Sequence, residues 1–91
     1  MSEITADTQY LFFLAHSYEK SMQAYKAFLT ICDQKYIHTI DVTDDVEAAI
    51  LYGIFVVPTL IRLSDKFTLA GELDDIDKVA AKLGLAKEQT S

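Results

Sequence analysis

The sequence predicts an α/β domain in which strands and helices follow the order β-α-β-α-β-β-α. Continuous apolar runs of strand length alternate with stripes of apolar residues that recur every three or four positions, the spacing of a buried helix face. Turn residues and helix-stop glycines separate these segments. The 91 residues, of which 51% are hydrophobic, suffice for one core but not for a second domain.

The first two elements are a central strand and a long helix. Residues 9–14 (QYLFFL) form a continuous apolar run, which is typical of a strand covered on both faces. Apolar residues then recur at helical spacing, namely Met22, Tyr25, Phe28 or Leu29, and Cys32. This spacing predicts a helix with Ser17 as its N-cap that runs to about Gln34.

The next two elements are an edge strand and a short helix. Residues 36–42 (YIHTIDV) are rich in β-branched and aromatic side chains, and their polar members favour an edge strand parallel to the first. Asp44 with Glu47 three residues later predicts a capping box, and Gly53 is expected just past the helix end. The side chains expected to form the buried stripe of this helix are Val46, Ala49 and Ile50.

A hairpin and a last helix complete the pattern. Two apolar runs, 59–63 and 67–71, flank the polar turn 64–66, which is typical of a β-hairpin. Asp74 is the expected N-cap of the last helix, and Gly84 is its expected stop. The expected buried face of that helix consists of Ile76, Val79, Ala80 and Leu83.

This order of elements describes a thioredoxin-like fold, a four-stranded mixed sheet with helices on both faces. The domain is expected to span residues 9–84, between a flexible N-terminus (1–8) and a flexible tail (85–91). Pro58, the one proline, then falls in the loop before the third strand, where such folds normally carry a cis-proline. A cis Val57–Pro58 bond is therefore expected, since cis costs an X-Pro bond only about 0.5–1 kcal/mol.

Composition excludes several kinds of partner. Fourteen acidic against eight basic residues give a formal charge of −6 and no basic stripe, so no nucleic acid is expected. The apolar stretch 53–63 has about half the length that a bilayer span needs, so no membrane association and a cytoplasmic location are expected. The single cysteine, Cys32, excludes an intramolecular disulfide and a cysteine zinc cluster.

Three stretches resemble the KaiB family of circadian-clock proteins, which includes the KaiB-like domain of the clock histidine kinase SasA. They are 11–28 (LFFLAHSYEKSMQAYKAF), 40–60 (IDVTDDVEAAILYGIFVVPTL) and 69–75 (LAGELDD). Their joint spacing, rather than any single motif, carries the resemblance. The residues that stand at the family's spacing are Ile40-Asp41-Val42, Ala49, Ile54 and Pro58-Thr59-Leu60.

The resemblance implies a non-enzymatic protein that binds partners, in the clock case the hexameric ATPase KaiC, and so regulates a phosphorylation rhythm. KaiB itself also switches between a tetrameric fold and a thioredoxin-like fold. Here the link 64–66 (SDK) is short and lacks proline, whereas the family has a proline-rich connection at this place. The difference favours a chain that keeps the thioredoxin-like fold, because proline isomers would supply the slow alternative states.

The expected partner surface combines the loop after the first strand, the edge strand and the second helix. An edge strand offers backbone groups for strand addition or for pairing with a second copy, so a homo-oligomer is a further expectation. Tyr18 and Tyr52 are the expected aromatic anchors. The residues assigned to partner binding are Ala15, His16, Tyr18, Tyr36, His38, Asp41, Asp44, Asp45 and Tyr52.

A glutathione-binding or thiol-redox protein of the same fold is the alternative. Its binding roles would fall to Ser17 or Tyr18, the Val57 backbone, and Glu72 or Asp74, with Lys20 and Lys66 as nearby cations. However, the first helix opens with residues 15–20 (AHSYEK), without the cysteine whose thiolate the helix dipole would stabilise. Cys32 lies near the other end of that helix, where core packing is expected. No catalytic residue, cofactor or metal ligand is therefore assigned.

Overall fold

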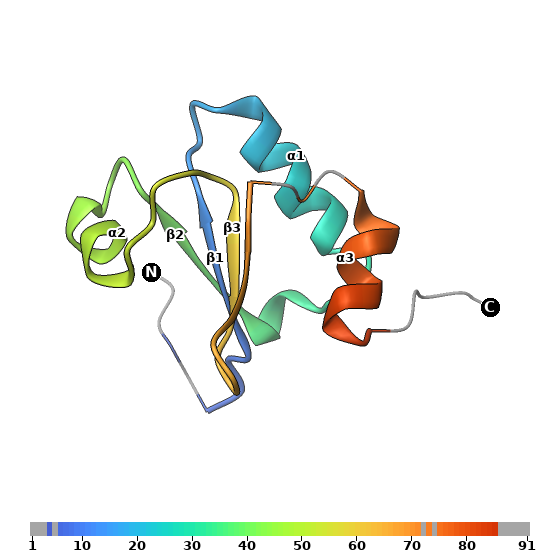
Figure 1. Cartoon of the computed structure of the whole chain (residues 1–91). Helices are drawn as coiled ribbons and strands as arrows, with labels where there is room; N and C mark the ends of the chain where they lie inside the picture. The colour runs from blue at the N-terminus through green and yellow to red at the C-terminus, as the bar shows by residue number, and fades with distance from the viewer. Residues whose placement is uncertain (1–3, 5, 72, 74, 86–91) are drawn as a thin grey trace.

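A computed structural model describes residues 4, 6–71, 73 and 75–85. In this part of the chain the elements follow the predicted order (Figure 1). They are β1 (Tyr10–Leu14), α1 (Glu19–Phe28), a 3₁₀ turn (Gln34–Tyr36), β2 (Ile37–Asp41), α2 (Val46–Tyr52), β3 (Thr59–Arg62), β4 (Phe67–Ala70) and α3 (Ile76–Leu83). None of the helices within these ranges has the length and apolar character needed to cross a membrane.

The strands form one mixed sheet in the order β2-β1-β3-β4, so β1 is central and β2 lies at an edge, as predicted. β1 runs parallel to β2, with Tyr10 opposite Ile37 and Leu14 opposite Asp41. β3 pairs antiparallel with both β1 and β4. The parallel register brings the carboxyl ends of β1 and β2 together, which places the loop after β1 beside Asp41.

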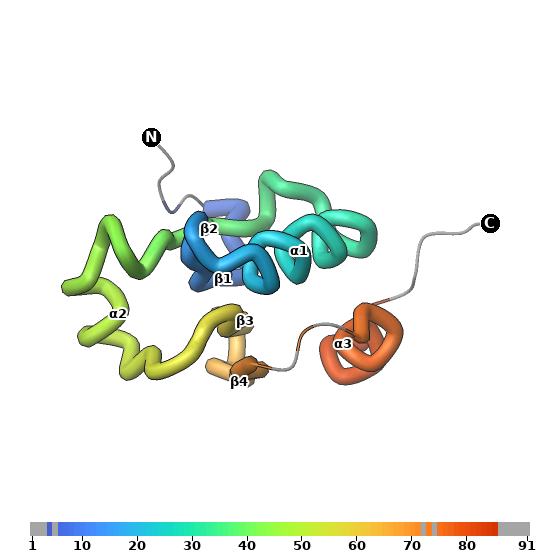
Figure 2. The backbone as a smooth tube through the Cα atoms, turned by 90° about the horizontal axis from the view of Figure 1, so that it is seen from above, coloured from blue at the N-terminus to red at the C-terminus, as the bar shows by residue number. Residues whose placement is uncertain are grey.

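Helices cover both faces of the sheet. Figure 2 shows α1 and α3 on one side of the strands and α2 on the other. All five β1 residues are buried, and they alternate between the two cores because successive strand side chains point to opposite faces. The larger core contains Tyr10, Phe12, Leu14, Ala24, Phe28, Ile37, Leu60, Leu73, Val79 and Leu83. The smaller core, on the α2 side, contains Leu11, Phe13, Ile40 and Ile61.

The first helix is shorter than the sequence predicted. α1 begins after Tyr18 and ends at Phe28, so the predicted N-cap at Ser17 and the predicted end near Gln34 are wrong. Asp33 has an extended backbone and its carboxylate accepts the Lys35 amide, so it caps the separate 3₁₀ turn instead of continuing the helix. The burial of the predicted stripe also differs. Phe28 is buried, Met22 and Tyr25 are half-buried, Leu29 is exposed, and Cys32 is half-buried in a bend beyond the helix.

The second helix presents a different face to the sheet than predicted. Its N-cap is Asp45, whose carboxylate accepts the Ala48 amide at 3.0 Å, so the assignment of Asp44 as cap is wrong. Val46 and Ile50, predicted to be buried, are 56% and 74% exposed. The helix contacts the sheet through Ala48 and through one side of the Tyr52 ring, which remains 40% exposed; these two residues are also four apart. Spacing alone therefore could not separate the inward face from the outward one.

The last three elements agree closely with prediction. β3 and β4 form the hairpin, and the Arg62 guanidinium bonds both carboxylate oxygens of Asp65 beside its turn. α3 is capped by Asp75 rather than by Asp74, which lies outside the described residues. The predicted buried face of α3 is buried at Val79, Ala80 and Leu83 and half-buried at Ile76. Gly53 and Gly84 end α2 and α3 in left-handed conformations, as predicted.

Candidate functional site

A groove of about 580 Å³ lies between α1 and β2, at the carboxyl ends of the two parallel strands. The residues that line it are Leu14, His16, Met22, Tyr25, His38, Thr39, Ile40, Asp41, Asp44 and Asp45. Apolar residues, two histidines and three aspartates thus border the same groove. Five of the nine predicted partner-binding residues meet here: His16, His38, Asp41, Asp44 and Asp45.

The other four predicted partner-binding residues lie elsewhere. Ala15 is 5% exposed, so its side chain offers almost nothing to a partner. Tyr18 lines a separate cavity of about 380 Å³ with Pro58. Tyr36 is half-buried beside β2's first residue, and Tyr52 lies on the α2 side with its ring 5.5 Å from that of Phe13. The nine residues are therefore distributed over the groove, a second cavity and the α2 side of the sheet.

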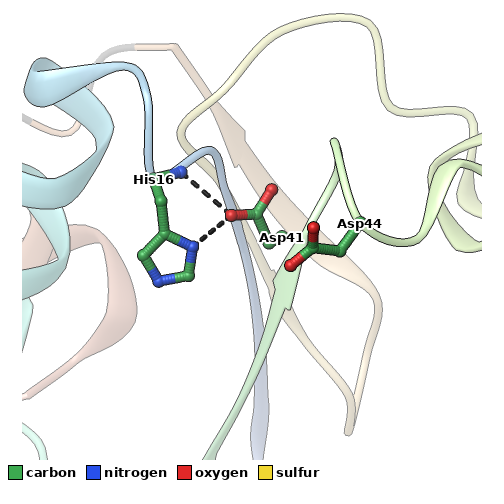
Figure 3. A group of neighbouring side chains, drawn as sticks. All are labelled: His16, Asp41 and Asp44. Atoms are coloured by element: carbon green, nitrogen blue, oxygen red, sulfur yellow. Dashed lines mark hydrogen bonds and ion pairs between the residues drawn. The ribbon is translucent and has the colours of Figure 1, made fainter.

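Asp41 connects the two loops at the mouth of this groove (Figure 3). Its carboxylate accepts the His16 backbone N–H at 3.0 Å and also hydrogen-bonds Nδ1 of the same residue. The other carboxylate oxygen accepts the Thr43 amide at 2.8 Å and the Thr43 hydroxyl. The bond from the Thr43 hydroxyl, together with those from His16 and the Thr43 amide, lowers the pKa of Asp41 well below its usual range.

The same cluster has donor atoms that metal ions use. His16, Asp41 and Asp44 each offer one ligand atom, and these atoms lie within 4.8 Å of one another. Both oxygens of Asp41 already accept hydrogen bonds from the adjoining loops, however. Structural zinc sites use four protein ligands, whereas this cluster supplies three. The geometry therefore favours a loop-positioning role for Asp41, and no metal is assigned.

Replacing Asp41 with asparagine is expected to change the pH dependence of stability. Because the folded-state pKa of Asp41 is lowered, the carboxylate stabilises the fold above the unfolded pKa, about 3.9, and this contribution is lost as the pH falls toward the folded pKa. Asp41→Asn should therefore be less stable than the parent at pH 7, and the difference should shrink below about pH 4. Urea unfolding across this pH range is the measurement.

Asp44→Asn is the matched control, because it removes a neighbouring carboxylate that is exposed. Its effect on the urea midpoint should be small throughout. A difference between Asp41→Asn and the parent that stays constant from pH 7 to about pH 3 would show that the charge of Asp41 contributes nothing.

The thiol lies away from the position at which this fold carries redox chemistry. Cys32 follows the C-terminal end of α1, where burial and then the charge of Asp33 raise the pKa of its thiol to about 11. Only about one thiol in ten thousand would be ionised at neutral pH, whereas a nucleophilic cysteine needs a lowered pKa. Beside the cis Val57–Pro58 bond, the start of α1 contributes Tyr18 and Lys20 to the cavity.

Only part of the set proposed for glutathione binding meets at one place, since Tyr18 and Lys20 line the cavity beside Pro58. Lys66, predicted to be nearby, lies in the β3–β4 turn, at the opposite end of the sheet from Pro58, so that prediction is wrong. Ser17 is exposed in the loop before α1. Glu72 and Asp74 lie outside the described residues. The alternative function therefore keeps Tyr18 and Lys20 beside the cis-proline, but it lacks the second predicted cation there and a thiol at the start of α1.

The apolar surface on the α2 side of the sheet extends well beyond the predicted anchor Tyr52, because Val46 and Ile50, predicted to be buried, are exposed there. We call it the α2 apolar surface; its members are Val46, Ile50, Leu51, Tyr52, Phe55 and Val56. Phe55 is 93% exposed, and Leu51 is 79% exposed. The available signal was the run 50–56 (ILYGIFV), which places apolar side chains on every side of a short helix end and cannot bury them all.

These features define a small thioredoxin-like domain that has a cis-proline before β3 and no cysteine at the start of α1. A solved structure of similar fold is the N-terminal domain of SasA from Synechococcus elongatus, with a TM-score of 0.54 and 19% identity over 91% of this chain and 86% of that chain. The likeness confirms the predicted thioredoxin-like fold and agrees with the sequence resemblance. No family model matches the chain, and no curated protein does.

Proposed function

We propose that this chain is a KaiB-like interaction module that regulates a KaiC-type ATPase, or a related signalling protein, by binding rather than by catalysis. The observation that carries the proposal is the shared fold with the N-terminal domain of SasA along 91% of the chain. The sequence resemblance over roughly residues 9–84 supports it. So does the start of α1, which places no thiol beside Pro58.

The groove between α1 and β2 is the proposed contact surface for this partner. Its exposed carboxylates, those of Asp44 and Asp45, can bind Lys or Arg side chains, while the apolar residues that line the groove can hold their methylene stems. β2 also forms one edge of the sheet, so its outer side can accept a strand from a partner. The alternative occupant of this edge strand is a second copy of this chain, which would form a homo-oligomer.

Co-elution with a KaiC-type ATPase from the same organism tests the proposal. We expect a complex on size-exclusion chromatography when the ATPase is loaded with ADP or with ATP. Asp44→Lys, which reverses a charge in the groove, should weaken the complex about tenfold or more. Thr68→Lys, which adds a charge to exposed β4 at the other edge of the sheet, should leave it unchanged. The absence of a complex with either nucleotide would refute the assignment.

A further inference from the structure

A second cavity, of about 380 Å³, lies on the opposite side of α1 from the groove. Met22 and Tyr25 line the groove, whereas Lys20, Ala24 and Ala27 line the cavity. At 3.6 residues per turn, these two sets lie on opposite sides of the helix. The cavity also reaches residues just before β3 and just after β4, at the same end of the sheet as the start of α1 (Figure 1). Small-molecule pockets have volumes of about 300–1,000 Å³, so the cavity is large enough for a small ligand.

Small and buried apolar residues leave this space open. Ala24, Pro58 and Leu73 all border the cavity, and all three are buried. Ala27, three residues further along α1, borders it as well and is half-buried. Because alanine carries a single methyl group, this side of the helix leaves a space that a larger side chain would fill. An apolar group of a ligand can therefore leave water against these residues.

The polar residues at the border of the cavity carry hydrogen-bond donors. Tyr18, Lys20 and Gln23 line it and are exposed, and none of the described aspartates or glutamates lines it. The groove has the opposite character, since three aspartates line it and no lysine or arginine of the described residues does. Within the described ranges the Lys20 ammonium forms no ion pair, and the adjacent Glu19 carboxylate accepts a hydrogen bond from Gln23. The border of this cavity therefore suits an anionic group.

We propose that this cavity binds a small organic acid in which one carboxylate ends an apolar chain. The carboxylate would face the Lys20 ammonium, and the chain would lie against Ala24, Pro58 and Leu73. An exposed lysine alone holds an anion only weakly, and an apolar lining alone does not select for charge, so the two together favour a ligand that has both features. The inference goes beyond the proposed function, because the cavity and the groove share no lining residue. It requires one cation and no thiol, unlike the glutathione alternative.

Titration of the full chain with hexanoate, followed by amide chemical shifts, tests this inference. We expect saturable changes centred on residues 18–27 and on Gly71 and Leu73. Affinity should rise about two- to fourfold for each methylene from butyrate to hexanoate, as chain burial requires. Hexanamide, which keeps the chain but lacks the charge, should bind about fivefold more weakly, and so should hexanoate to Lys20→Gln. Ala27→Leu keeps a good helix former while filling the cavity, so it should weaken binding about tenfold or more.

Lys26→Gln is the matched control, since Lys26 is an exposed lysine of the same helix that does not line the cavity. It should leave the affinity for hexanoate unchanged. Equal affinity for hexanoate and hexanamide, shifts centred on the groove, or no saturable shift would each overturn the inference. So would binding of glutathione, or of a short peptide through its carboxyl terminus, when hexanoate does not bind. The ATPase is absent from this titration, so these results leave the proposed function to its own test.

Discussion

Phe12→Ala is expected to lower the free energy of unfolding by about 3–5 kcal/mol, the cost of truncating a buried aromatic ring. Phe12 is 0% exposed in the middle of the central strand. Its ring centroid lies 5.3 Å from that of Tyr25 and 5.9 Å from that of Phe28, so the truncation removes two aromatic contacts and leaves a cavity. Domains of this size are stable by only about 5–15 kcal/mol, so the loss is a large share of the total.

Phe55→Ala is the matched control, because it makes the same chemical change at a ring that is 93% exposed. Its effect on stability should stay within about 0.5 kcal/mol. Urea unfolding followed by far-UV circular dichroism compares the two variants with the parent. Equal losses for Phe12→Ala and Phe55→Ala would contradict the described positions of these rings.

Ser21→Ala is expected to cost about 1–3 kcal/mol, the second large effect. Ser21 is 0% exposed, and its Oγ accepts the backbone N–H of Ala15 at 3.1 Å. The hydroxyl proton has acceptors in the carbonyls of Ala15 and Tyr18, at 2.8 Å and 2.7 Å. Alanine would leave the buried amide of Ala15 without this acceptor, and an unsatisfied buried donor is costly.

Ser17→Ala provides the control for this second prediction. Ser17 is exposed and precedes the actual N-cap, Tyr18, whose side chain makes no capping bond. The variant should therefore unfold within about 0.5 kcal/mol of the parent. Thermal unfolding of both serine variants decides between the described loop and the predicted cap. A larger loss for Ser17→Ala than for Ser21→Ala would restore Ser17 as the cap.

The two serines show which contacts the local sequence pattern can predict and which it cannot. Ser17 precedes an acidic first turn, which is the local signature of an N-cap. Ser21 lies on the buried face of α1 with Ala24 and Phe28, but the local sequence carries no signal of its importance. The loop after β1 bends back toward α1, so that Ser21 bonds a backbone amide six residues earlier in the chain. That contact depends on the path of the loop, which periodicity does not describe.

The groove likewise contains a side-chain contact that the local sequence pattern could not predict. His16 and Asp41 were assigned to one partner surface for different reasons, one from a loop and one from an edge strand. Their direct bond follows from the parallel register, which sets Leu14 opposite Asp41 and brings the two strand ends together. Sequence reasoning could select the segments that meet, because the strand order was inferred correctly. Sequence reasoning could not predict which side chains form hydrogen bonds, or on which surface each tyrosine lies.

The sequence by itself determined the order of elements, the central position of β1 and the place of Pro58 before β3. These features depend on apolar runs, turn residues and the rules of chain connection, all of which can be inferred from short stretches of sequence. Only the tertiary structure decided which face of α2 is exposed, where α1 begins and which polar groups line the groove. Those outcomes follow from packing between segments distant in the chain, where Ala48 rather than Ile50 fits against the smaller core.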